Sequence, residues 1–120
     1  MKKLLIYSVI ILSSGCEGIF CTASIEPGIE LTVKNSNNEF IGEYVTAVIF
    51  DDDYIDTLKI YSQNELGEVV SLRGADERPG VYSLIILSDL YETYTHTNIV
   101  VWRGECHVKT VNLNVILDNK

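Results

Sequence analysis

The fold of this chain is decided by a short apolar run, VYSLIIL at residues 81–87. The run follows a turn signal, ERPG at residues 77–80, in which Pro79 fixes φ and Gly80 permits a positive φ. A nearly continuous apolar segment of this length is typical of a strand that is buried on both faces. We therefore expect residues 81–87 to form a central strand of a sandwich.

A second pattern lies upstream, where IELTVK at residues 29–34 alternates apolar and polar side chains. This period of two is typical of a half-buried strand. Further short extended segments follow, separated by turns at intervals of roughly eight to twelve residues. No segment after the N-terminal region has a convincing helical period. The sequence therefore predicts an all-β sandwich of about seven or eight strands.

Residues 106–117 are expected to close the domain as a long last strand. The apolar positions change parity along it, because Val111 and Leu113 share one face whereas Cys106 and Val108 share the other. Either a bulge near residues 109–110 switches the faces, or the start of the strand is buried on both sides.

The first sixteen residues, MKKLLIYSVIILSSGC, have the layout of a bacterial secretory signal. Two lysines precede an apolar run at residues 4–12, which is far shorter than the ~20 residues that span a bilayer. Because a cysteine directly follows the small residues, the segment is similar to a lipoprotein signal in which Cys16 is acylated. We expect a signal peptide at residues 1–15, a lipidated cysteine and short tether at 16–20, and one β-sandwich domain at 21–120.

This signal predicts a lipid-anchored protein of the bacterial cell envelope. Glu17 follows the cysteine in place of aspartate, which favours the outer membrane if the host is Gram-negative. The net charge is -8, and removal of residues 1–15 takes away two lysines and no acid, which leaves -10. Such a chain repels nucleic acid and anionic lipid, so we expect no nucleic-acid partner and attachment to the membrane through acyl chains.

The chain has three cysteines. If Cys16 carries lipid, Cys21 and Cys106 remain as a pair, for which a disulfide is the default in an oxidising compartment. The alternative is a metal site or a reactive thiol, although Cys106 and His107 have no second ligand pair at zinc spacing.

Two polar loops are candidate partner-binding loops, and their residues are Asp51, Asp52, Asp53, Glu77 and Arg78. The simpler interpretation is a pair of solvated turns, with Arg78 paired to a nearby carboxylate. The aspartates together with Asp56 offer oxygen ligands for calcium, but the EF-hand spacing and its final glutamate are absent. We expect no metal site and no other cofactor.

A catalytic site is not predicted. His96 and His107 are the only histidines, and no serine lies in a Gly-x-Ser-x-Gly elbow. The sequence also lacks a His-Glu-x-x-His motif. We therefore expect a non-enzymatic protein; the alternative is a small metal-dependent or hydrolytic envelope enzyme that uses His96 and His107.

Two clusters, ERPGVY at residues 77–82 and ECHV at 105–108, resemble the bacterial carboxypeptidase regulatory-like domain proteins. The resemblance covers nearly all of the chain after the signal. It implies a small transthyretin-like (prealbumin-like) sandwich, a Cys21–Cys106 disulfide, an envelope location and no catalytic residue. Where the family usually has glycine, this chain has Leu90 and Asp52. The function implied is a binding or accessory module for an unknown envelope protein or polymer.

Overall fold

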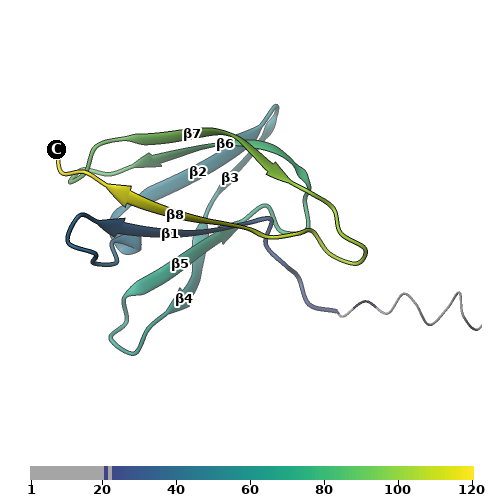
Figure 1. The fold of residues 1–120 in the computed structure, drawn as a ribbon, viewed down its shortest axis with the longest axis horizontal. Helices are drawn as coiled ribbons and strands as arrows, with labels where there is room; N and C mark the ends of the chain where they lie inside the picture. Colours follow the sequence, from purple (N-terminus) through teal and green to yellow (C-terminus); the bar gives the residue numbers. More distant parts are fainter. Residues whose placement is uncertain (1–20, 22) are drawn as a thin grey trace, which may run out of the picture.

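The computed structural model describes Cys21 and residues 23–120. Eight strands form two four-stranded sheets (Figure 1), which confirms the predicted all-β class and number of strands. The first sheet has the order β4-β5-β1-β8, with β1 at Ile29–Asn35, β4 at Lys59–Gln63, β5 at Val69–Gly74 and β8 at Val111–Leu117. The second sheet has the order β3-β2-β6-β7, with β2 at Thr46–Asp51, β3 at Tyr54–Thr57, β6 at Gly80–Leu87 and β7 at Tyr94–Val101.

One short 3-10 helix, η1 at Gly42–Tyr44, completes the elements of the described chain. The signal at residues 1–15, the lipidated Cys16 and the tether to residue 20 lie outside the described residues.

The first and last strands lie side by side. β1 pairs with β8 in parallel, from Ile29 opposite Val111 to Asn35 opposite Leu117, and its other edge pairs with β5 antiparallel. All other strand pairs are antiparallel. The parallel pair is possible because a long connection, residues 36–110, joins the end of β1 to the start of β8.

The core lies between the two sheets. The alternating positions Ile29, Leu31 and Val33 of β1 are at most 1 % exposed, and they belong to the same buried cluster as Ile49 and Leu84 of the second sheet. Burial of each such side chain contributes about 1.5–3 kcal/mol, so these rows supply much of the stability of the sandwich. The period of two that predicted β1 therefore arises from its half-buried position.

The last strand is shorter than predicted. β8 begins at Val111, and residues 102–110, which we name the β7–β8 loop, fold back on themselves. Within this loop Lys109 donates its backbone N–H to the carbonyl of Trp102 over 2.8 Å. Cys106 and Val108 therefore differ in parity from Val111 and Leu113 because they belong to a loop that precedes β8. Neither expected explanation, a bulge within the strand or a strand start buried on both sides, is correct.

The turn before β6 also differs from the expectation. Positive φ values occur at Ala75 (55°) and Glu77 (52°), and Gly80 does not have one. A Cβ at Gly80 would lie 2.5 Å from a carboxylate oxygen of Asp51. The small size of Gly80 leaves room for the Asp51 carboxylate at the start of β6, and this glycine does not adopt a positive φ.

The chain changes sheets between β3 and β4. Leu58, which connects these two strands, is 6 % exposed and belongs to the core. Its side chain fills the space above Gly74 of β5, where a Cβ would lie 2.2 Å from the Leu58 Cδ2 atom. Asp56 Oδ2 would lie 3.1 Å from the same Cβ. Gly74 therefore lets the crossing segment approach the β5 backbone.

We expect Gly74→Ala to lower the free energy of unfolding by about 1–3 kcal/mol, because the new methyl group overpacks the space that Leu58 fills. Urea denaturation of the two proteins measures the difference. Gly67→Asn is the matched control, since Gly67 has φ 84° and no heavy atom within 4 Å of a built Cβ, and asparagine tolerates that backbone conformation. Equal losses of stability in both variants would contradict the proposed packing.

Candidate binding surface

The two sheets present different outer faces to solvent. On the first sheet, the parallel register sets Glu30 beside Asn112 and Thr32 beside Asn114. These four side chains point away from the core, since the alternate residues of β1 are buried. This face is mostly polar, as is usual for the solvated side of a sheet, and Ile116 of β8 is exposed on it.

The outer face of the second sheet is largely apolar, with Thr46, Thr57, Ser83 and Thr95 between its hydrophobic residues, and we name it the apolar face. Five large hydrophobic side chains on it are more than a third exposed: Phe50, Ile55, Val81, Leu87 and Val100. Val48 and Ile85 complete the surface as half-buried residues. Monomeric soluble proteins rarely expose a contiguous patch of this kind without a function.

The strand register makes these side chains contiguous. Phe50 lies opposite Ile55 on one side and Ser83 on the other, and Val48 lies opposite Ile85. Val81 and Val100 form a further cross-strand pair between β6 and β7. The apolar face therefore extends across all four strands of the second sheet.

The run at residues 81–87 predicted a central strand, and β6 does lie inside its sheet, between β2 and β7. Its inward residues Tyr82, Leu84 and Ile86 are fully buried. Its outward residues belong to the apolar face, which no element of the described chain covers. Sequence reasoning missed this surface because a nearly continuous apolar run has the same pattern whether its second face is covered by the chain itself or left open.

The predicted loops lie together at one end of the sandwich. Arg78 donates from Nη1 to Asp51 Oδ2 over 3.2 Å and to the Tyr82 hydroxyl over 2.9 Å. Its guanidinium also lies 3.9 Å from the ring centroid of Tyr54. The expected pairing of Arg78 with a carboxylate is therefore found. Asp52 and Asp53 are exposed at the tip of the β2–β3 hairpin, where Asp52 has φ 53°.

Asp56 anchors the neighbouring turn. Its Oδ2 accepts a hydrogen bond from the Tyr54 hydroxyl over 3.1 Å and from the backbone N–H of Ala75 over 3.0 Å. Burial and, after it, the nearby charge of Asp56 raise the pKa of Tyr54 to about 12. The Tyr54 phenol therefore stays protonated, and its O–H donates a hydrogen bond to Asp56. This carboxylate therefore holds a positive-φ residue in place.

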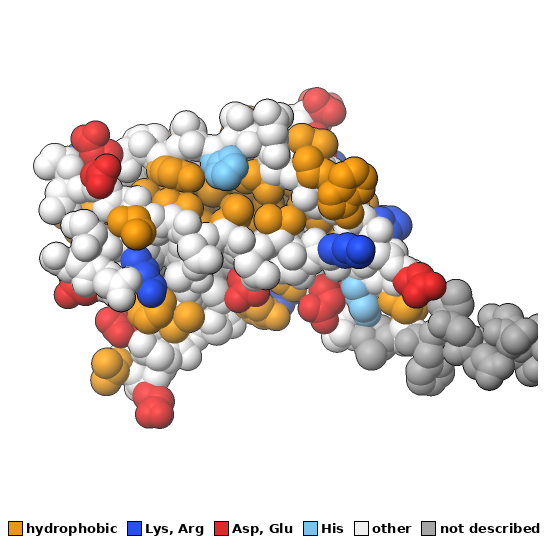
Figure 2. All heavy atoms as spheres, viewed as in Figure 1, with side chains coloured by type: hydrophobic (Ala, Val, Ile, Leu, Met, Phe, Trp, Pro, Cys, Tyr) orange, Lys and Arg blue, Asp and Glu red, His pale blue; other side chains and the backbone are white. Residues whose placement is uncertain are grey.

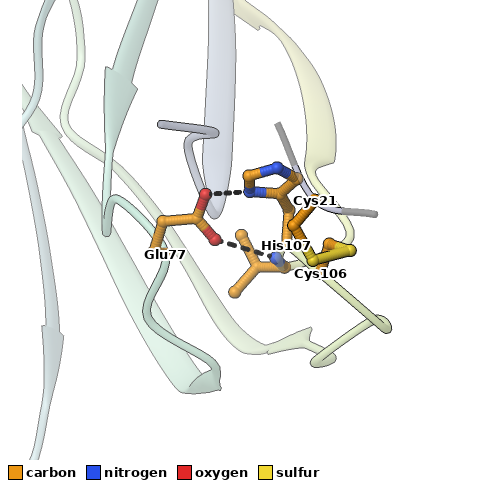
Figure 3. Close-up of a disulfide and its surroundings, with 5 residues drawn as sticks. Cys21, Glu77, Cys106 and His107 are labelled. Atoms are coloured by element: carbon orange, nitrogen blue, oxygen red, sulfur yellow. Dashed lines mark hydrogen bonds and ion pairs between the residues drawn. A yellow bond between two sulfur atoms is a disulfide. The ribbon is translucent and has the colours of Figure 1, made fainter. Parts of the chain in front are cut away.

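Glu77 joins three segments that are far apart in the sequence, and Figure 3 shows its two contacts with residues 107–108. Its Oε2 accepts the backbone N–H of Glu26 over 2.9 Å, and its Oε1 accepts that of Val108 over 3.1 Å. The His107 Nδ1 lies 2.5 Å from Oε2, which makes an ion pair when the imidazole is protonated. We name this arrangement the Glu77 clamp. It ties the β5–β6 turn to the N-terminal arm (residues 23–28) and to the β7–β8 loop.

The clamp changes the titration of its carboxylate. The backbone hydrogen bond from Glu26 lowers the pKa of Glu77 below its ordinary 4.5, and the bonds from His107 and Val108 act in the same direction. Desolvation acts against them without cancelling the shift. Each of these donors stabilises the ionised carboxylate more than the neutral acid.

A disulfide between Cys21 and Cys106 lies beside the clamp (Figure 3). The two Cα atoms are 5.2 Å apart, and the cysteines are separated by 85 residues in the chain. The clusters at residues 77–82 and 105–108 therefore meet in space through Glu77 and His107. Through this disulfide, Cys106 of the β7–β8 loop holds Cys21 next to that loop.

The two histidines lie apart, as the separate pale-blue groups in Figure 2 show. His96 is exposed in β7, within 3.4 Å of the Tyr94 hydroxyl, whereas His107 belongs to the Glu77 clamp. A hollow of 620 Å³ lies elsewhere, lined in part by Tyr44, Leu87 and Lys120, and it contains neither histidine. The predicted alternative of an enzyme that uses both histidines thus lacks a shared pocket in the part of the chain described.

Within residues 21 and 23–120, no group of three or more His, Cys, Asp or Glu side chains is placed to hold a metal ion. The aspartates of the hairpin do not converge, because Asp51 is turned to Arg78 and Asp56 to Tyr54 and Ala75. The same part of the chain has no helix with the length and hydrophobicity to cross a membrane.

Comparisons with known proteins place this chain in no family. It matches no family model, no curated protein and no solved structure.

We expect Glu77→Gln to lower the melting temperature at pH 7, because an amide oxygen accepts hydrogen bonds less strongly than a carboxylate does. Since folding lowers the pKa of Glu77, its stabilisation is complete above pH 4.5 and is lost as the pH falls through the lowered value. The difference in melting temperature between wild type and variant should therefore shrink below pH 4.5. Thermal unfolding from pH 7 to pH 3 measures it.

The matched control is Glu105→Gln, which removes the charge of an exposed glutamate in the β7–β8 loop. This variant should melt close to the wild type at each pH. A difference for Glu77→Gln that stays constant down to pH 3 would contradict the role given to its ionised carboxylate.

Proposed function

We propose that this protein is a lipid-anchored, non-enzymatic binding module of the bacterial cell envelope, and that a protein partner docks on the apolar face. The observation that carries the proposal is the contrast between the two outer faces of the sandwich. One is mostly polar, with Ile116 as an exposed hydrophobic residue on β8, and the other exposes Phe50, Ile55 and Val81 in adjacent cross-strand rows.

The chemistry of the apolar face favours a protein over a polar polymer. Its exposed side chains are mostly aliphatic, with one aromatic ring, Phe50. Fully covering a residue such as Ile55, which is 70 % exposed, stabilises a complex through removal of apolar area from water. Hydrophobic residues in the centre of a patch are typical of protein interfaces.

We further propose that the chain is similar to the carboxypeptidase regulatory-like domains, whose role is accessory. The support is a two-sheet fold with eight strands in which the two sequence clusters meet at the Glu77 clamp. The disulfide beside that clamp suits an oxidising compartment. The sequence of residues 1–16 supports lipid attachment at Cys16.

We expect Cys16→Ser to release the protein from washed membranes without unfolding it, because acyl chains on Cys16 provide the attachment. Fractionation and circular dichroism measure the two effects. The intact mass of the native protein, alkylated without reductant, should show loss of residues 1–15, added acyl chains and no alkylated thiol. A variant that still pellets with washed membranes would contradict the anchor.

We expect a photo-crosslinking amino acid in place of Ile55 to capture a discrete envelope protein in intact cells. The same amino acid in place of Thr32, on the polar outer face of the first sheet, is the matched control and should not capture it. Val81→Ser in the Ile55 crosslinking variant should reduce the yield, since it removes apolar contact from a neighbouring row. Equal capture from both positions, or capture from neither, would contradict binding through the apolar face.

A further inference from the structure

The β7–β8 loop begins with an exposed indole. Trp102 is the only tryptophan of the chain and is 68 % exposed. It follows directly after Val101, and its carbonyl accepts the backbone N–H of Lys109, so it lies at the base of a closed loop. Tryptophan is enriched at interfaces where one end of the ring meets an apolar phase and the N–H stays in water.

The proposed anchor lies close to this loop in the chain. Four residues separate Cys16 from Cys21, and a fully extended segment of that length reaches at most about 18 Å. Cys21 in turn is held to Cys106, which belongs to the same loop as Trp102. A membrane that carries acyl chains on Cys16 is therefore within reach of the loop.

The charged residues of the loop suit an interface between lipid and water. Arg103 and Lys109 are exposed and flank the loop, with Glu105 between them. Figure 2 shows hydrophobic and basic side chains together at the end of the molecule that carries the N-terminal arm. Tryptophan is enriched at the level of lipid headgroups, where its ring is apolar and its N–H stays hydrated, and basic side chains accompany it there.

We propose that the β7–β8 loop rests on the bilayer that holds the anchor, with the Trp102 indole in the headgroup layer. This inference rests on the proposed lipid attachment at Cys16. The disulfide and the Glu77 clamp then fix the tilt of the sandwich, because both connect the N-terminal arm to this loop. In this arrangement β1 and β8 run away from the membrane from Ile29 and Val111 onward.

Electrostatic attraction does not drive this contact. The chain is strongly acidic, and the hairpin with Asp52 and Asp53 lies at the same end of the sandwich, since Asp51 pairs with Arg78. That hairpin joins β2 and β3, which are separated from β7 by β6. Neighbouring strands are about 4.8 Å apart, so the acidic tip is displaced sideways from the loop by roughly 10–15 Å. The contact should therefore form on uncharged phosphatidylcholine and gain nothing from anionic lipid.

The single tryptophan permits a direct test. The mature lipidated protein, extracted from its membranes, is reconstituted into phosphatidylcholine vesicles with either ordinary or brominated acyl chains. We expect the emission of Trp102 to shift to the blue on reconstitution and to lose intensity in the brominated vesicles. Cys16→Ser protein, added to the same vesicles at the same concentration, should show neither effect.

A second variant tests the orientation. Trp102→Phe combined with Ile116→Trp moves the indole to an exposed position near the far end of β8, where Ile116 is 62 % exposed. The tryptophan emission of this double variant should keep its intensity in the brominated vesicles. The proposed orientation is wrong if the emission is quenched in both proteins, or in neither of them although both float with the vesicles. Either result would still agree with lipid attachment at Cys16. Failure of the wild type to float with the vesicles overturns the anchor itself.

Discussion

The carboxylate of Glu77 is the contact on which the organisation of this end of the molecule depends. One side chain accepts hydrogen bonds from the N-terminal arm and the β7–β8 loop, while its own backbone adopts a positive φ in the β5–β6 turn. The backbone N–H of Glu77 also bonds the carbonyl of Glu26. Three segments without regular secondary structure thereby obtain partners for their backbone groups, which a loop at the surface otherwise leaves to water.

The disulfide and the clamp act on the same two segments in different ways. The covalent bond between Cys21 and Cys106 limits how far the arm and the loop separate, and it does so chiefly in the unfolded chain. The hydrogen bonds of Glu77 set their positions in the folded chain. Together they hold Cys21 and the N-terminal arm against the sandwich.

Much of the fold was predictable from local sequence pattern. The alternation at residues 29–34 reports the burial of one face of β1, and the apolar run at 81–87 contains the buried inward row of β6, although its outward row stays open. The boundaries that were wrong lie where side chains from distant strands decide. The β7–β8 loop is held by backbone hydrogen bonds across it, and Gly80 lies against the carboxylate of Asp51, a residue on another strand.

The sequence by itself determined the all-β class, the pairing of Arg78 with a carboxylate, and the composition of the two clusters that meet in space. Only the tertiary structure decided that Glu77 reaches Val108 and His107, that the hairpin aspartates turn to different partners, and that one sheet keeps an apolar outer face. The physical reason is that strand periodicity is a local property of the chain. The order of strands in a sheet, and hence which surface stays uncovered, depends on contacts between residues that lie far apart in the sequence.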